Sequence, residues 1–252
     1  MKKPLIKFCL LACITLFVAC ADSIKLTDNG EVQLPRTIII ADAHSYSRYE
    51  YNYDNQNRIT KVSRYHNHEY LLNEAELDEI QTFTYIENDL VKVVAESKGS
   101  YSIEFSKSED KISITRKFYD GTIYTTSTMD LNNDGYPSRC ESATLGVGYS
   151  QVETYQFHEG NLMKHSFEGL YGDVPRDGDY EYIYDNEKSP FFYCETPKWG
   201  MIYLNYGISK NNVIKSNGVT YHYEYSDGFP IKCTMKYNND EEYESVTEYK
   251  YN

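Results

Sequence analysis

The protein is 252 residues long, and its 38 acidic and 25 basic residues give a formal net charge of −13 at pH 7. Tyr occurs 27 times, and hydrophobic residues make up 40% of the chain, a composition that excludes a wholly disordered polymer. The acidic balance also argues against a nucleic-acid partner, because sequence-independent binding to phosphates needs clustered Lys and Arg.

The first residues have the pattern of an export signal. Lys2, Lys3 and Lys7 precede an apolar run from Phe8 to Ala19. This run is too short for a membrane-spanning helix, which needs about 20 apolar residues. We therefore predict a signal peptide over residues 1–19, which takes no part in the fold.

The residues around the end of this signal point to a lipid anchor. Leu16-Phe17-Val18-Ala19-Cys20 resembles the lipobox of bacterial lipoproteins, although Phe17 stands where that motif usually has Leu. The resemblance implies that the thiol of Cys20 is acylated after cleavage, which would attach the protein to a membrane through palmitate-type chains. The alternative is an ordinary signal peptide cut near Ala19 or Ala21, with Cys20 incidental.

We expect residues 20–35 to form a linker and residues 36–252 to form a single all-β domain of hairpin repeats. The clearest hairpin is Tyr51–Val62, in which Tyr51 and Tyr53 alternate with polar residues and an Asn-rich turn follows. This unit resembles the YD repeat of bacterial surface and toxin shells. Asn57 stands where that repeat has Gly, and Asn is the other residue that tolerates the left-handed region.

Similar turns recur along the chain at irregular spacing. We predict them at residues 87–89, 107–110, 158–161, 185–186 and 226–228, where Asn, Asp or Gly favours the positive φ of tight hairpins. Helix signals are weak. Tyr70–Ile80 fits either one or two amphipathic helical turns or part of a long hairpin.

These units predict an all-β fold. About fourteen to sixteen strands would form one long antiparallel meander that curls or closes into a barrel-like sheet. Charged residues alternate with Tyr in segments such as Tyr221–Tyr225 and Glu244–Tyr251. A membrane barrel needs an apolar band that faces lipid on every strand. We therefore expect a water-soluble sheet.

One segment matches a calcium-binding loop by spacing. Asp130, Asn132, Asp134 and Glu141 occupy the oxygen-ligand positions of the pattern D-x-N-x-D-G-x5-E. However, Pro137 stands where such loops place an apolar strand residue, and no flanking helices are evident. We favour a plain hairpin turn and expect no metal here.

Other residues that could bind metal or react are sparse. His66 and His68 would share one side of a strand, but no third ligand is evident. Cys140, Cys194 and Cys233 are the cysteines that remain after Cys20, so at most one internal disulfide can form. The sequence contains no phosphate loop, dinucleotide fingerprint or nucleophile elbow, and we expect no cofactor.

The segment from Phe191 to Tyr203 departs most from the hairpin rhythm. Tyr193, Trp199 and Tyr203 could contact a ligand by stacking on sugar rings. The alternative, which we favour, is that these aromatic residues plug the end of the curled sheet, since large aromatics are more often core than ligand platform.

Three further stretches point to a family. Lys188–Phe191, Ser209–Val213 and Asp227–Lys232 follow a lipoprotein signal in the order found in lipoproteins of unknown function from Bacteroides-like bacteria, which the chain resembles. The resemblance implies a porin-like antiparallel β fold and a cell-envelope setting, and no activity.

The sequence thus predicts a lipid-anchored outer-membrane lipoprotein that acts as a binding or scaffold module without catalysis. A glycan or an envelope protein is the expected partner. The alternative is a glycan-processing enzyme that uses a pair of carboxylates, which would have to face each other across a cleft about 5–10 Å wide.

Overall fold

The computed structural model describes residues 32–42, 44–67, 75–97, 99–146, 148–172, 174–237 and 240–251. Residues 33–252 make up one compact unit. The predicted signal peptide, Cys20 and most of the predicted linker lie outside the described residues, and so does His68.

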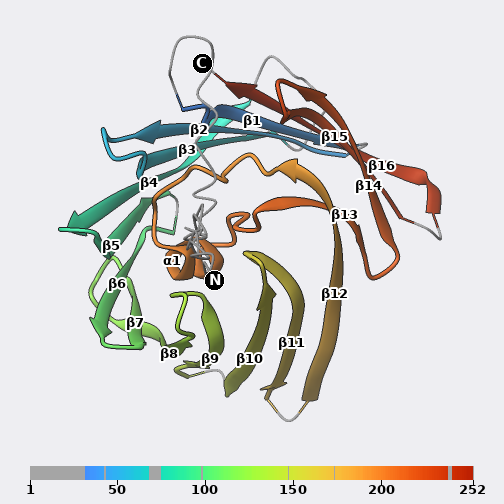
Figure 1. Ribbon diagram of the computed structural model, residues 1–252. Helices are drawn as coiled ribbons and strands as arrows, with labels where there is room; N and C mark the ends of the chain where they lie inside the picture. Colours follow the sequence, from blue (N-terminus) through green and yellow to red (C-terminus); the bar gives the residue numbers. More distant parts are fainter. Residues whose placement is uncertain are drawn as a thin grey trace, which may run out of the picture. The chain divides into compact units, whose positions relative to one another are not determined.

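Sixteen strands of the described chain form one closed antiparallel barrel, in which β1 pairs with both β2 and β16 (Figure 1). Every other strand pairs with its neighbours in the sequence. The strands are β1 (Pro35–Asp42), β2 (Tyr46–Tyr53), β3 (Ile59–Asn67), β4 (Glu76–Ile86), β5 (Asp89–Glu96), β6 (Tyr101–Ser108), β7 (Lys111–Phe118), β8 (Ile123–Leu131), β9 (Pro137–Thr144), β10 (Tyr149–His158), β11 (Asn161–Tyr171), β12 (Val174–Lys188), β13 (Asn211–Ser216), β14 (Val219–Ser226), β15 (Phe229–Tyr237) and β16 (Asp240–Tyr251). The predicted all-β meander is confirmed, and it closes.

Most of the predicted turns are tight hairpins with left-handed residues. Asn57 has a φ of 61°, and Glu87, Glu109 and Asp227 have φ values of 54°, 53° and 53°. Positive φ matches the twist of two-residue hairpin turns to that of the strands. The turn predicted at residues 185–186 is wrong, because β12 continues to Lys188.

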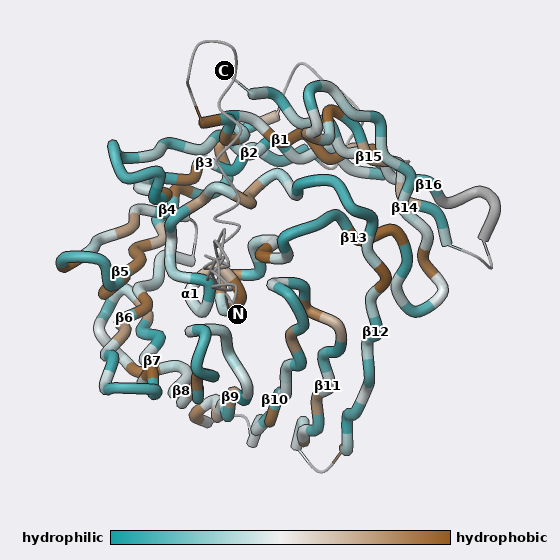
Figure 2. The backbone as a smooth tube through the Cα atoms, viewed as in Figure 1, coloured by the Kyte–Doolittle hydropathy of each residue, from teal (hydrophilic) through white to brown (hydrophobic). Residues whose placement is uncertain are grey.

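The two faces of the wall differ in polarity. Ile112 and Ile114 of β7 are buried inside the barrel, while Lys111 and Ser113, which alternate with them, are exposed. Figure 2 shows this alternation along several strands. Cross-strand ion pairs cover the outer face, as between Lys117 and Glu104, and others join Lys164 to Asp179, Lys232 to Glu224 and Lys236 to Glu244. Period-two alternation therefore places apolar and Tyr side chains inside and charges outside.

The connection between β12 and β13, residues 189–210, folds back into the barrel (Figure 1). We call this segment the plug. It contains α1 (Lys198–Tyr203), the one helix in the described part of the chain. Trp199 of α1 is 3% exposed, and its ring lies 5.2 Å from that of Phe105 on β6. Aromatic packing of this kind buries the apolar side of the plug against the wall.

Hydrogen bonds also hold the plug to the wall. Thr196 accepts a hydrogen bond of 2.8 Å from the backbone N–H of Ile59, and its hydroxyl lies 3.1 Å from that of Tyr85. The backbone N–H of Glu195 donates to the carbonyl of Asn57 at 3.1 Å. The plug is thus attached to β3, β4 and the β2–β3 turn.

The helix considered for Tyr70–Ile80 is not formed in its described part, where β4 begins at Glu76. Among the described residues, no helix is both long enough and apolar enough to span a bilayer.

Candidate functional site: a cavity between the plug and the barrel wall

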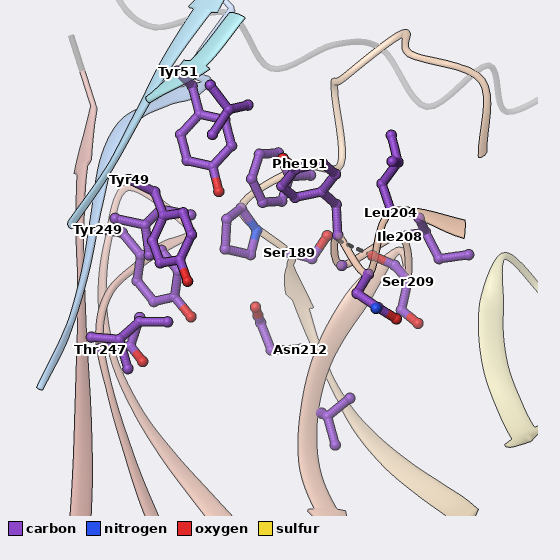
Figure 3. Close-up of a pocket in the computed structure, with 18 of the residues that line it drawn as sticks. Tyr49, Tyr51, Ser189, Phe191, Leu204, Ile208, Ser209, Asn212, Thr247 and Tyr249 are labelled. Carbon is purple, nitrogen blue, oxygen red and sulfur yellow. Dashed lines mark hydrogen bonds between the residues drawn. The ribbon is translucent and has the colours of Figure 1, made fainter. Parts of the chain in front are cut away.

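A cavity of about 560 Å³ lies between the plug and the inner face of the barrel (Figure 3). Its size falls within the range of about 300–1,000 Å³ that is usual for small-ligand sites. Strands β1–β4, β14 and β16 form one side, and the plug with the start of β13 forms the other. The lining includes Ile38, Ile40, Tyr49, Tyr51, Arg64, Glu79, Gln81, Ser189, Phe191, Tyr206, Ile208, Ser209, Asn212, Val213, Tyr223, Thr247 and Tyr249.

Tyrosines dominate the strand side of the cavity. Tyr49 and Tyr51 project from β2, and Tyr249 projects from β16 (Figure 3). Burial raises the pKa of Tyr51 and of Tyr249 well above the ordinary value for a phenol. Both groups therefore stay neutral near pH 7, where each offers a ring and a hydroxyl that can donate a hydrogen bond.

Asn212, at the start of β13, supplies the most unusual polar group in the cavity. It is 3% exposed, and its amide nitrogen donates to the carbonyls of Lys188 at 3.1 Å and Glu187 at 3.3 Å. Its backbone N–H donates to the carboxylate of Asp185. The side-chain oxygen Oδ1 is buried without a hydrogen-bond partner. A strong acceptor is therefore left without a donor, and protein atoms enclose it.

A second polar group lies at the β4 side. Gln81 donates from its side-chain nitrogen to Glu79 at 2.7 Å, and its side-chain oxygen accepts a 2.7 Å hydrogen bond from the hydroxyl of Tyr206. Arg64 is paired with Asp78. Among the described residues that line the cavity, Glu79 is the one carboxylate.

The aromatic residues singled out from the sequence lie elsewhere in the plug. Tyr193, Trp199 and Tyr203 do not line this cavity. Trp199 and Tyr193 are buried, and the ring of Tyr203 lies 5.9 Å from that of Phe105. These positions fit the alternative that the aromatic residues fill the barrel. The ligand-contact role of the three residues stays a prediction, and no feature of this geometry supports it.

The calcium-like segment forms the turn between β8 and β9. The side-chain oxygen of Asn132 accepts backbone N–H groups from Asp134 and Tyr136, each at 3.0 Å. Asp130 is paired with Lys111, and Glu141 is paired with Arg139. These contacts are those of a hairpin turn and of the charged outer wall. No group of three or more His, Cys, Asp or Glu within the described ranges is arranged to hold a metal ion.

The three cysteines in the described part of the chain, Cys140, Cys194 and Cys233, are free and buried. Burial raises the pKa of Cys140 and of Cys233 to about 11, which disfavours the reactive thiolate. His66 lies 2.8 Å through Nδ1 from the hydroxyl of Ser47.

Sequence reasoning missed the residues that shape the cavity. Asn212 falls within the stretch Ser209–Val213, and Tyr51 falls within the best hairpin, but neither stretch indicates a shared cavity. They meet because the barrel closes and the plug folds inward.

Comparison with known proteins adds a likeness of fold. No protein-family model and no curated protein matches this chain. Among solved structures, it is similar to a porin-like protein from Bacteroides uniformis, with 12% identity and a TM-score of 0.40 over 86% of this chain and 98% of the other. It is also similar to a porin-like protein from Bacteroides vulgatus, with 13% identity and a TM-score of 0.44 over 87% and 99%. We take nothing about ligand or activity from this likeness.

Proposed function

We propose that the protein is a lipid-anchored module of the cell envelope that binds a small molecule in the cavity and does not transform it. The observation that carries this proposal is the cavity itself. Its walls are a closed barrel and a plug tied to that barrel through Thr196 and Tyr206, so the site is formed before a ligand arrives. Preformed concave sites with a few convergent polar groups are typical of small-molecule binding.

The charged outer face of the barrel favours a protein that stays in water and is attached to the membrane through lipid. Charged pairs on β5–β7, β11–β12 and β14–β16 occupy the face that would meet lipid in a membrane barrel. Charges there are unfavourable near the bilayer midplane. The acylation predicted at Cys20 would supply the attachment in their place.

The single carboxylate among the described lining residues of the cavity favours binding over glycan hydrolysis. That chemistry needs two carboxylates that flank the scissile bond, about 5–10 Å apart. Glu79 has no second carboxylate beside it among the described lining residues, and Gln81 donates to it. The enzyme alternative therefore lacks its required pair at this site.

A cavity-filling variant tests the proposal. Ile40 lines the cavity, and Ile39 lies on the opposite face of the same strand, so Ile40→Trp and Ile39→Trp are matched. We expect ligand-observed NMR on the full chain to find library compounds that bind the wild type and Ile39→Trp but not Ile40→Trp. Compounds that bind all three proteins equally, or no compounds at all, would contradict a binding function for this cavity.

Catalysis is tested on the same samples. We expect no turnover when the full chain is incubated with a panel of nitrophenyl glycosides. Turnover that Glu79→Gln abolishes would replace the binding proposal with the enzyme alternative.

A further inference from the structure

The register of the strands shows that the cavity is most enclosed at one end. Tyr51 of β2 pairs with Val62 of β3, and both side chains are buried and line the cavity. Ile38 pairs with Tyr49 in the next row of inward-facing residues. Ile40 follows one row further along, where it is 36% exposed. An occupant therefore enters past Ile40 and reaches its most apolar surroundings beside Tyr51 and Val62.

Three aromatic rings meet at this enclosed end. Tyr51, Phe191 and Tyr206 all line the cavity. The ring centroid of Tyr51 lies 5.2 Å from that of Phe191 and 6.1 Å from that of Tyr206, and both contacts are edge-on. The rings of Phe191 and Tyr206 lie 6.4 Å apart. Aromatic pairs gain more than their apolar area alone provides. This end of the cavity therefore favours an aromatic occupant over a saturated one.

Side-chain hydrogen bonds are available from the strand side of the cavity. The hydroxyls of Tyr49 and Tyr249 form no hydrogen bond with the described residues, and Figure 3 shows both directed from the strands into the cavity. The serines of the plug are already engaged. Ser189 donates to the carbonyl of Ser209, and the Ser209 hydroxyl accepts from the backbone N–H of Leu162. An occupant therefore gains hydrogen bonds from the tyrosine wall and apolar contact from the plug.

The charges at the cavity favour an uncharged ligand. Arg64 and Glu79 are the two charged residues among the described lining. They lie directly opposite each other on β3 and β4, and Arg64 is also paired with Asp78. Gln81 donates to the carboxylate of Glu79 at 2.7 Å. These charges therefore compensate each other within the wall. A charged ligand would lose its hydration without gaining an opposite charge that is free to pair with it.

We propose that the occupant is an uncharged aromatic compound that carries a hydroxyl or carbonyl group. Its ring packs against Tyr51, Phe191 and Tyr206, and its polar group bonds to the hydroxyl of Tyr49 or Tyr249, one row nearer the rim. This inference rests on the proposed binding function and names its ligand class. A saccharide would bring more hydroxyls than the two phenols can bond, and an aliphatic chain would lose the contacts between rings.

Calorimetry and saturation-transfer NMR on the full chain test the ligand class. The probes are 2-naphthol, 2-acetonaphthone and flavone. The comparison compounds are 2-naphthoate, 2-decalol and glucose, which are charged, saturated and polyhydroxylated respectively. We expect at least one probe to bind more than about tenfold more tightly than every comparison compound. A smaller margin, or no binding of any probe, overturns the inference.

Variants of the lining residues test where the probe binds. At least one of Tyr49→Phe and Tyr249→Phe should weaken binding of the tightest probe roughly fivefold, as the loss of one hydrogen bond predicts. Naphthalene, which lacks a polar group, should bind these variants and the wild type equally. Phe191→Leu should weaken binding of the probe and of naphthalene alike. Tyr251→Phe is the matched control, because Tyr251 shares β16 with Tyr249 but its hydroxyl donates to the carbonyl of Pro230 outside the cavity lining.

Each tyrosine variant removes a single oxygen, so the test holds even if Phe191→Leu does not fold. Probe binding that no cavity variant weakens, or that Tyr251→Phe weakens as much, overturns the inference. If the aromatic probes fail while library compounds still depend on Ile40, the binding function stands without this ligand class. If no compound depends on Ile40, both proposals fail.

Discussion

Glu153 is a partly buried carboxylate on the inner wall of β10, away from the cavity. His165 lies 3.0 Å from it on β11, and the hydroxyl of Tyr155 donates to the same carboxylate oxygen. Burial acts to raise the pKa of Glu153, but these hydrogen bonds outweigh it and hold the pKa below the ordinary value. The carboxylate is therefore favoured in the folded state.

This shift predicts how stability depends on pH. A folded-state pKa below the unfolded value of about 4.3 means that the contribution of Glu153 is present above that pH. It is lost as the pH falls through the folded pKa. We expect Glu153→Gln to lower the free energy of unfolding at pH 7 by about 1–3 kcal/mol and to reduce the acid-induced loss below pH ~4. Urea titrations at several pH values measure both effects. If the free energy of unfolding fell equally steeply with decreasing pH in the wild type and in Glu153→Gln, the prediction would be contradicted.

Asn57 tests the chemistry of the turns. Its φ of 61° lies in the left-handed region, and its carbonyl accepts the N–H of Glu195 from the plug. The left-handed region costs an ordinary residue about 1–2 kcal/mol. We expect Asn57→Ala to destabilise the protein by about 1 kcal/mol, and Asn57→Gly to change stability little. Thermal unfolding of the two variants measures the difference, and a less stable Gly variant would show that φ does not limit this turn.

At the scale of elements, a buried hydroxyl of the plug contacts two strands of the wall. Thr196 is 1% exposed and contacts both the N–H of Ile59 and the hydroxyl of Tyr85. Thr196→Val keeps the shape of the side chain but leaves the Ile59 N–H buried without its acceptor. We expect a loss of about 1–3 kcal/mol. Urea unfolding measures it.

The same substitution should loosen the plug before the barrel unfolds, because the strand pairing does not involve Thr196. Hydrogen exchange of plug amides should then speed up more than that of β6 and β7 amides. Thr60→Val is the control, because the Thr60 hydroxyl donates an exposed hydrogen bond to the carbonyl of Asn52 and not to the plug. Equal acceleration in plug and strands would mean that the two unfold as one.

At the scale of the whole molecule, attachment to the envelope is predicted to reside in lipid at Cys20. Removal of residues 1–19 takes away three Lys and no acid, so the net charge changes from −13 to −16. Such a surface is repelled by an anionic membrane. Each buried methylene contributes about 0.8 kcal/mol, and two or three acyl chains anchor a protein stably whereas one binds marginally.

We therefore expect radioactive palmitate to label the wild-type chain, which should stay in the membrane fraction. Cys20→Ser should lose the label and leave that fraction if ordinary signal peptidase still cuts it. Cys140→Ser is the matched control, because Cys140 is buried in the barrel, and it should keep both label and fraction. A wild-type protein in the soluble fraction, with no lipid mass on residue 20, would contradict the anchor.

Local sequence determined the elements and most of their turns. Tyr and aliphatic residues alternate with charged ones, and this pattern places one face of each strand in water and the other inside, whatever the partners of that strand. Turn residues such as Asn57 and Asp227 likewise act within a few residues of themselves. For that reason the all-β class and the approximate strand number were predictable. The continuation of β12 through residues 185–186, where a turn was predicted, was not predictable in this way, because Asp185 is held in β12 by Asn212, which is 27 residues away.

Tertiary structure alone decided closure and the cavity. Pairing of β1 with β16 joins residues about two hundred positions apart, and no local pattern specifies a contact at that range. The same holds for Asn212 and Tyr249, which reach one cavity from β13 and β16. The sequence predicted aromatic residues in the plug, but it did not indicate that Trp199 would pack on the wall while Phe191 and Tyr206 would line the space. That choice depends on how the plug fits a closed barrel, because packing is a property of the assembled interior rather than of any one segment.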